Sequence, residues 1–241
     1  HDKAGTPRAF EALPLFSGRS TLEGAYMQSS PTSPFVFYIQ SELTETHACP
    51  SLSYKCTTFD PERALAHLEL FNVKEVIAVT DKVKTALGAN SGYREEGEIG
   101  PYKIFQVRQG TGQYVVPLRY QPALVADGDW KRLAYDWFQK PEWLEVPLLF
   151  PRPGDPVPSG AVPFHDLEQQ PVKQLFSPEC RVNDAIGNEE VRFDTECPGR
   201  PHLIKVSYHP KWRVEGADRI YLVSPSFMLV YPTAKQVRLV F

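Results

Sequence analysis

The stretch SGRSTLEGAYMQSS, residues 17–30, gathers side chains that could recognise a polar ligand. Arg19, Glu23 and Gln28 could hydrogen-bond to hydroxyl or phosphate groups, and the ring of Tyr26 could stack on a sugar. The Gly and Ser residues between them indicate a loop, and loops often carry binding residues. The alternative is structural, because Arg19 and Glu23 could simply pair with each other to hold the loop.

Trp212 is a further candidate for ligand contact. It ends the segment HPKW, which is expected to form a turn between two strands. An exposed indole there could stack on a glycan. A tryptophan at the end of a β-sandwich can equally close the core, and both interpretations stay open.

The chain has four cysteines, and their spacing indicates two local disulfides. Cys49 and Cys56 enclose a short loop, and Cys180 and Cys197 enclose a longer one. We predict these two pairings and therefore an oxidising, extracytoplasmic location. Other pairings, free thiols in a cytosolic core and a zinc site are the alternatives. Zinc is disfavoured, because no spacing is C-x-x-C and no histidine is expected near Cys180 or Cys197, so we expect no metal and no cofactor.

Composition excludes several classes of function. A net charge of -3, a pI near 6.1 and no Lys/Arg cluster argue against a nucleic-acid partner. The sequence lacks a P-loop, a dinucleotide-binding fingerprint and a G-x-S-x-G nucleophile elbow. Two acidic clusters could supply paired carboxylates for glycoside hydrolysis, although such clusters are usually solvated surfaces. Their members are Glu95, Glu96 and Glu98, and Glu189, Glu190 and Asp194.

The pattern of elements predicts an α+β protein. Residues 1–150 are expected to form a small α/β unit with long loops. In it FVFYIQ is expected to be a strand, and Asp60 and Pro61 to begin a helix. A Pro/Gly-rich linker over residues 151–171 is expected next. Residues 172–241 then read as strand after strand with turns between them, which predicts an antiparallel β-sandwich.

A resemblance to a known family rests on several segments. LIKVSYHPKWRVEGADRIYLVSPSFMLVYPTAKQVRLVF resembles the extracytoplasmic β-domain of bacterial multi-pass membrane proteins related to GT-C-type glycosyltransferases. In that family a strand enters a Tyr-x-Pro-x-Trp-like turn, matched here by residues 208–212. LELFNVKEVIAV and FEALPLFSGRSTLEGAYMQSSPTSPF are similar to further segments of the group catalogued as having a 6-pyruvoyl-tetrahydropterin-synthase-related domain. Pterin chemistry is not expected, because none of the six histidines forms an H-x-H pair.

The resemblance implies a function for the chain. It implies a non-catalytic domain, periplasmic or extracellular, tethered to the membrane by flanking spans, with one following the strand that ends at Phe241. Such a domain would shape the membrane-embedded site and help to hold a glycan or lipid-linked sugar. A free-standing secreted carbohydrate-active enzyme or carbohydrate-binding module is the alternative.

Overall fold

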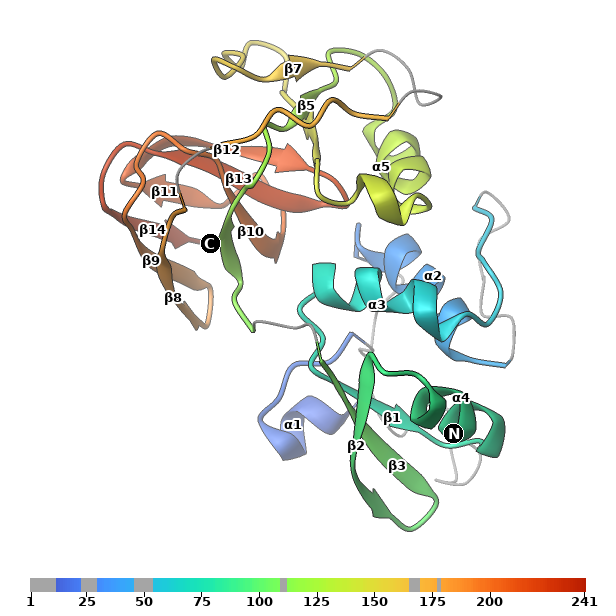
Figure 1. The fold of residues 1–241 in the computed structure, drawn as a ribbon. Helices are drawn as coiled ribbons and strands as arrows, with labels where there is room; N and C mark the ends of the chain where they lie inside the picture. Colours follow the sequence, from blue (N-terminus) through green and yellow to red (C-terminus); the bar gives the residue numbers. More distant parts are fainter. Residues whose placement is uncertain (1–11, 23–29, 46–53, 109–111, 165–169, 177–178) are drawn as a thin grey trace. The chain divides into compact units, whose positions relative to one another are not determined.

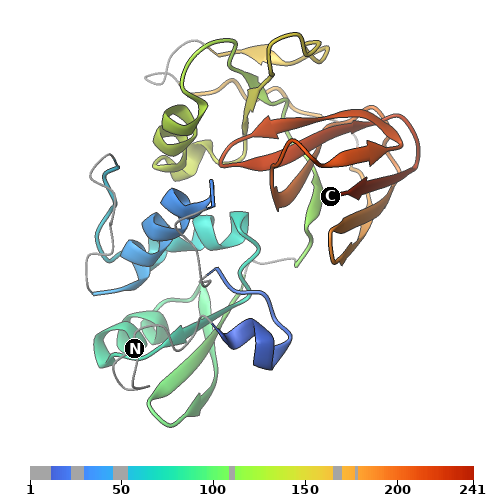
Figure 2. The ribbon, with the colours of Figure 1, turned by 180° about the vertical axis from the view of Figure 1, so that it is seen from behind.

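The chain folds into two compact units of α+β type. A computed structural model describes residues 12–22, 30–45, 54–108, 112–164, 170–176 and 179–241. The units are His1–Thr111 and Gly112–Phe241, and their elements can be followed in Figures 1 and 2. Most strand pairs are antiparallel and strands dominate the second unit, which confirms the predicted fold class. Within the described ranges, no helix combines the length and apolar character needed to cross a bilayer.

The first unit contains a small antiparallel sheet and several helices. Its three strands lie in the order β1-β3-β2. Helix α3 begins as predicted, because the Asp60 carboxylate accepts a hydrogen bond from the backbone N–H of Arg63 (3.1 Å) and a proline occupies the first turn. The elements are α1 (Leu13–Ser17), α2 (Ser33–Leu43), α3 (Pro61–Leu70), β1 (Glu75–Ala78), α4 (Asp81–Ala89), β2 (Tyr93–Ile99) and β3 (Tyr102–Val107).

The predicted strand FVFYIQ is wrong, because this segment lies in helix α2. Its buried apolar residues are Phe35, Val36, Tyr38 and Ile39, and spacings of three and four residues place them on one helical face. The proline in the first turn also favours the start of a helix. A short apolar run rich in aromatic and β-branched residues does not distinguish a buried helix from a strand.

The second unit contains two sheets. The larger has seven strands in the order β4-β10-β13-β12-β6-β5-β7, and the smaller has four in the order β11-β14-β9-β8. Only the pairs formed by β5 are parallel among the described strand pairs of this unit. The elements are β4 (Val115–Pro117), β5 (Ala123–Leu124), α5 (Trp130–Phe138), η4 (Pro141–Trp143), β6 (Leu148–Phe150), β7 (Val162–Pro163), β8 (Val182–Gly187), β9 (Glu190–Thr195), β10 (His202–Ser207), β11 (Arg213–Glu215), β12 (Ala217–Val223), β13 (Phe227–Pro232) and β14 (Gln236–Val240).

The two sheets of this unit share one hydrophobic core. Ile204 and Met228 of the larger sheet and Leu239 of the smaller are all 0% exposed and belong to one packed cluster. Phe193 on β9 joins the same cluster. Face-to-face packing of two sheets over a common core is the β-sandwich that the sequence predicts.

The boundary between the units lies earlier than predicted. The sequence suggests a first domain over residues 1–150, but β4 pairs with β10 and β6 pairs with β12. Helix α5 also packs on β6. The expected linker, residues 151–171, contains β7, which pairs with β5. Pairing between strands far apart in the chain leaves no local signal in the sequence, so residues 112–150 gave no sign of their partners.

Gly216 lets the chain pass from the smaller sheet of the second unit to the larger one. It lies between β11 in the smaller sheet and β12 in the larger, with φ of 80°. A Cβ atom at this position would lie 2.1 Å from the carbonyl oxygen of Gln236. Only glycine fits there, because both the backbone conformation and the close approach exclude a side chain. Strands β11 and β12 flank Gly216, and both contribute residues to a surface pocket.

Candidate functional site

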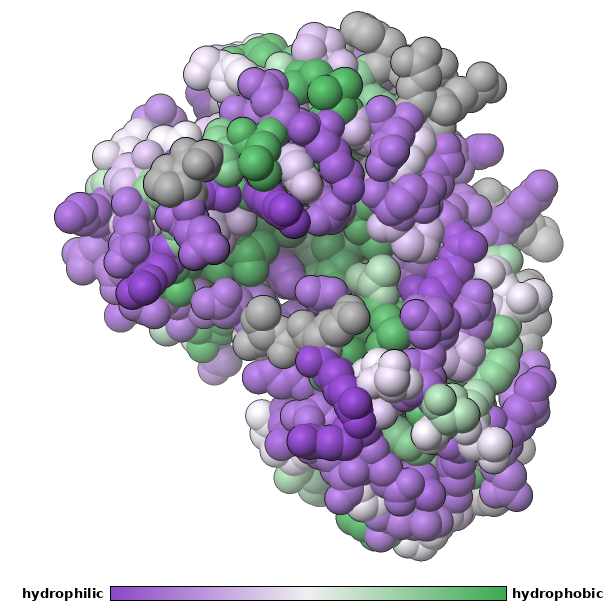
Figure 3. All heavy atoms as spheres, viewed as in Figure 1, coloured by the Kyte–Doolittle hydropathy of each residue, from purple (hydrophilic) through white to green (hydrophobic). Residues whose placement is uncertain are grey.

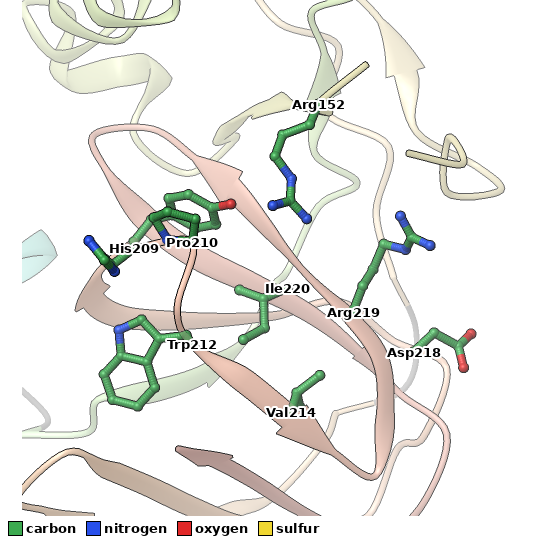
Figure 4. Close-up of a pocket in the computed structure, with 9 residues that line it drawn as sticks. Arg152, His209, Pro210, Trp212, Val214, Asp218, Arg219 and Ile220 are labelled. Carbon is green, nitrogen blue, oxygen red and sulfur yellow. The ribbon is translucent and has the colours of Figure 1, made fainter. Parts of the chain in front are cut away.

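A shallow pocket of about 210 Å³ opens on the second unit, where the turn between β10 and β11 meets β12 (Figure 4). Pockets that hold drug-sized ligands measure roughly 300–1,000 Å³, so this smaller pocket suits one small ring or one anionic group. The lining combines aromatic rings, guanidinium groups, a carboxylate and aliphatic side chains. Its members are Arg152, Tyr208, His209, Pro210, Trp212, Val214, Asp218, Arg219 and Ile220.

Backbone and ring contacts fix the turn that carries the aromatic residues. The N–H of Tyr208 donates to the carbonyl of Ser226 (2.7 Å), and the N–H of Trp212 donates to the carbonyl of His209 (3.1 Å). The Trp212 ring packs partly on the sandwich core and lies 5.4 Å from the ring of Phe241. His209 approaches the same ring at 5.1 Å. Trp212 packs on the core and also lines the pocket, so its contact with a ligand stays a prediction.

Asp155 holds the two arginines of the pocket in place. Its carboxylate accepts hydrogen bonds from the backbone N–H (3.1 Å) and Nε (3.4 Å) of Arg152 and from Nη1 of Arg219 (2.6 Å). Burial acts to raise the pKa of Asp155, but the hydrogen bonds from Arg152 and the charge of Arg219 outweigh it and lower the pKa. The carboxylate therefore stays ionised and keeps both guanidinium groups oriented.

The arginines leave hydrogen-bonding capacity for a ligand. In Figure 4 Arg152 lies above Ile220 and Arg219 to its right, whereas the carboxylate of Asp218 is directed away from this centre. Nε of Arg219 is buried and has no hydrogen-bond partner in the described part of the chain. An unmet buried donor is unusual in proteins and is typically satisfied by water or a ligand. The pocket can therefore offer an aromatic face and charged donors to a polar group.

The predicted loop site is only partly described. Arg19 lies just after α1, is largely exposed and forms an ion pair with Glu75 at the start of β1. The Arg19–Glu23 pair that the sequence offers as a structural alternative stays a prediction, because Glu23 lies outside the described residues. Glu23, Tyr26 and Gln28 lie outside the described residues, so a ligand site at this loop stays a prediction.

The disulfide between Cys180 and Cys197 is present, as predicted. It joins the segment before β8 to the turn after β9, and these two strands are neighbours in the smaller sheet. Cys49 lies outside the described residues, so the Cys49–Cys56 bridge stays a prediction.

Basic neighbours neutralise the acidic clusters noted in the sequence. In the first cluster, Lys103 pairs with Glu95 at 3.0 Å and Lys84 pairs with Glu98 at 3.5 Å. In the second, Glu190 accepts hydrogen bonds from Arg238 and Arg192, which lower its pKa. These ion pairs are typical of a solvated surface, which is the structural interpretation of both clusters.

A buried hydrogen-bonded pair, Glu42 and His67, is a structural feature of the first unit rather than a site. Nδ1 of His67 on α3 lies 2.8 Å from Oε2 of Glu42 on α2, and both side chains are 0% exposed. Nε of Arg63 lies 3.3 Å from the other oxygen of Glu42. Burial raises the pKa of Glu42, and the hydrogen bond with His67 opposes this shift. No ligand can reach side chains that are fully enclosed.

His202 lies beside the second disulfide, which the sequence does not indicate. Its Nε2 lies 3.9 Å from Sγ of Cys197 and 2.8 Å from Oγ1 of Thr195. One feature of the sequence could have indicated this proximity: His202 follows Cys197 by five residues and begins a strand of alternating polarity. This spacing is not a C-x-x-C motif, and only the pairing of β9 and β10 with other strands brings the groups together.

Comparisons with known proteins give one match. Residues 1–118 are similar to a family described as a domain of unknown function (DUF8559). The matched region covers the first unit and reaches β4 of the second. No curated protein and no solved structure matches the chain. The similarity therefore concerns the first unit above all, and its description assigns no activity.

Proposed function

We propose that this chain is an extracytoplasmic domain of a multi-pass membrane protein related to GT-C-type glycosyltransferases. In this proposal the pocket beside Trp212 holds part of a glycan or lipid-linked sugar, and the domain itself carries out no chemistry. The domain would present the sugar to an active site formed by the membrane-spanning part of the parent protein.

The pocket is the observation that carries the proposal. Sugar rings offer an apolar face and several hydroxyl groups, so their sites combine an aromatic side chain with oriented polar groups. Trp212 supplies the aromatic ring here, and Arg152 and Arg219 supply donors that Asp155 holds in position. A phosphate of a lipid-linked sugar would also be attracted to the guanidinium groups.

Two further features agree with the proposal. The Cys180–Cys197 disulfide is compatible with an oxidising compartment outside the cytoplasm. Hydrophilic residues predominate on the face shown in Figure 3, where hydrophobic residues appear in small groups. A surface of this kind suits a polar ligand. The resemblance of residues 203–241 to the β-domain of the glycosyltransferase-related proteins supplies the link to the membrane.

We expect the purified 241-residue chain to bind a subset of bacterial cell-envelope oligosaccharides on a glycan array. For the best ligand, calorimetry should then show at least about tenfold weaker binding by Trp212→Ala, because truncation of a central aromatic contact typically removes more than 1 kcal/mol. Arg219→Ala should weaken binding of an anionic glycan more than that of a neutral one.

The matched control is Trp130→Ala, which removes another half-buried tryptophan of the second unit that does not line the pocket. Equal losses in the two tryptophan variants, or no binding by the parent chain, would contradict the pocket assignment. Turnover of a glycan by the purified chain would instead support the secreted enzyme. Hydrophobic spans on both sides of this segment in the complete reading frame would support the membrane tether.

A further inference from the structure

The second disulfide belongs to a cluster with the chemistry of a metal site. Sγ of Cys180, Sγ of Cys197 and a ring nitrogen of His202 all lie within 4.8 Å of one another. In tetrahedral zinc sites Zn–S is about 2.3 Å and Zn–N about 2.0–2.1 Å, which places ligand atoms about 3.5–3.8 Å apart. The distance of 3.9 Å from Cys197 Sγ to His202 Nε2 is close to this range. Reduction would let the two bonded sulfurs separate to the spacing that zinc requires.

Hydrogen bonds prepare His202 to act as a ligand. Nδ1 lies 2.7 Å from the carbonyl oxygen of Arg200, and because a carbonyl only accepts, Nδ1 carries the ring proton. Nε2 therefore presents a lone pair, which accepts a hydrogen bond from the Thr195 hydroxyl at 2.8 Å. A backbone carbonyl that fixes the tautomer from behind is the usual outer-shell partner of a zinc-binding histidine.

The surroundings favour an immobile ring. His202 is 0% exposed and stacks on Phe193 with ring centres 5.4 Å apart. The hydroxyl of Thr195 lies 3.6 Å from each sulfur and would turn aside or become a neighbour of the metal. Both cysteines are only partly buried, which leaves a route for an ion.

Rigid strands hold the ligands. Thr195 ends β9, His202 begins β10, and Cys180 lies two residues before β8. Val182 of β8 pairs directly with Thr195. We therefore expect the two cysteines and His202 to stay near one another when the S–S bond is reduced.

We propose that Cys180, Cys197 and His202 bind Zn²⁺ when the disulfide between the two cysteines is reduced. A phosphine reductant and water supply two electrons and two protons, which convert the disulfide to two thiols and the phosphine to its oxide. Binding of Zn²⁺ then releases the two thiol protons and forms two Zn–S bonds. Water completes the fourth position. The disulfide and the zinc site are alternative states of the same residues, chosen by the redox potential of the compartment.

The test compares metal binding by the oxidised and the phosphine-reduced chain. After chelation and removal of all metal, one equivalent of Zn²⁺ should bind to the reduced chain in native mass spectrometry, and none to the oxidised chain. Co²⁺ should produce a thiolate-to-cobalt charge-transfer band only in the reduced sample. The Cys180→Ser, Cys197→Ser double variant should lose both signals, although it keeps Cys49 and Cys56.

Two histidine variants complete the test. His202→Gln should weaken Zn²⁺ binding at least about tenfold, whereas His209→Gln, an exposed histidine of the same unit, should bind like the parent chain. His202→Cys should restore binding and strengthen the cobalt charge-transfer band, which a purely structural role of His202 would not explain. Absence of Zn²⁺ from the reduced parent chain, or unchanged binding by His202→Gln, would overturn the proposal.

Discussion

Replacing Glu42 by alanine is expected to lower the free energy of unfolding by about 3–5 kcal/mol, and His67→Ala should have an effect of similar size. The two side chains join α2 to α3 through a contact of 2.8 Å, and neither is exposed to solvent. Removing one partner leaves the other buried without its main counterpart, and desolvation then opposes folding. Arg63 lies 3.3 Å from Glu42 and would lose its ion pair as well.

Urea unfolding followed by circular dichroism measures this effect. The matched control is Glu45→Ala. Glu45 lies just after α2 and forms a long surface ion pair, 3.9 Å, with exposed Lys82. Its change should stay below about 1 kcal/mol. The Glu42→Ala, His67→Ala double variant should lose less than the sum of the single variants, since the two groups interact directly. Additive losses, or a loss in Glu42→Ala no larger than in Glu45→Ala, would contradict a coupled buried pair.

Replacing Cys180 and Cys197 together by alanine is expected to lower the free energy of unfolding by about 3 kcal/mol in the presence of a chelator. The two cysteines are separated by 17 positions in the sequence. Opening a loop of this length raises the conformational entropy of the unfolded chain, and β8 and β9 remain paired in the native state. The chelator prevents a metal from replacing the disulfide.

The control uses the parent chain under the same conditions with a phosphine reductant. Its stability should fall to or below that of the double variant, because the reductant opens the same bridge. A double variant within about 0.5 kcal/mol of the oxidised parent would show that the closed loop contributes little, and the assignment of the disulfide as a stabilising feature would fail.

Local features of the fold could be predicted from the sequence. Asp60 and Pro61 mark the start of α3 because capping depends on adjacent residues, and the structure has this cap. The disulfide at Cys180 could be predicted because its partner closes a short local loop. The strands after residue 180 alternate in burial, as on β9 and β14, and this period is visible without a structure.

Non-local features could not be predicted in the same way. Residues 112–150 join the larger sheet through partners such as β10 and β12, and no spacing in the sequence encodes such a pairing. The pocket shows the same limit. Trp212 was a candidate from the sequence, but Asp155 and Arg219 meet across 64 positions. Only the packing of the loop after β6 against β12 reveals that they form one group.

The position of the bound glycan shows most directly whether the pocket beside Trp212 is a sugar site. Hydrogen–deuterium exchange of the full chain, with and without the best glycan from the array, reports which backbone amides the ligand protects. A sugar site at the pocket predicts protection in residues 207–221 and around Arg152 and Asp155, and loss of that protection in Trp212→Ala at the same glycan concentration. Protection confined to residues 17–30, or protection that persists unchanged in Trp212→Ala, would contradict a sugar site at the pocket.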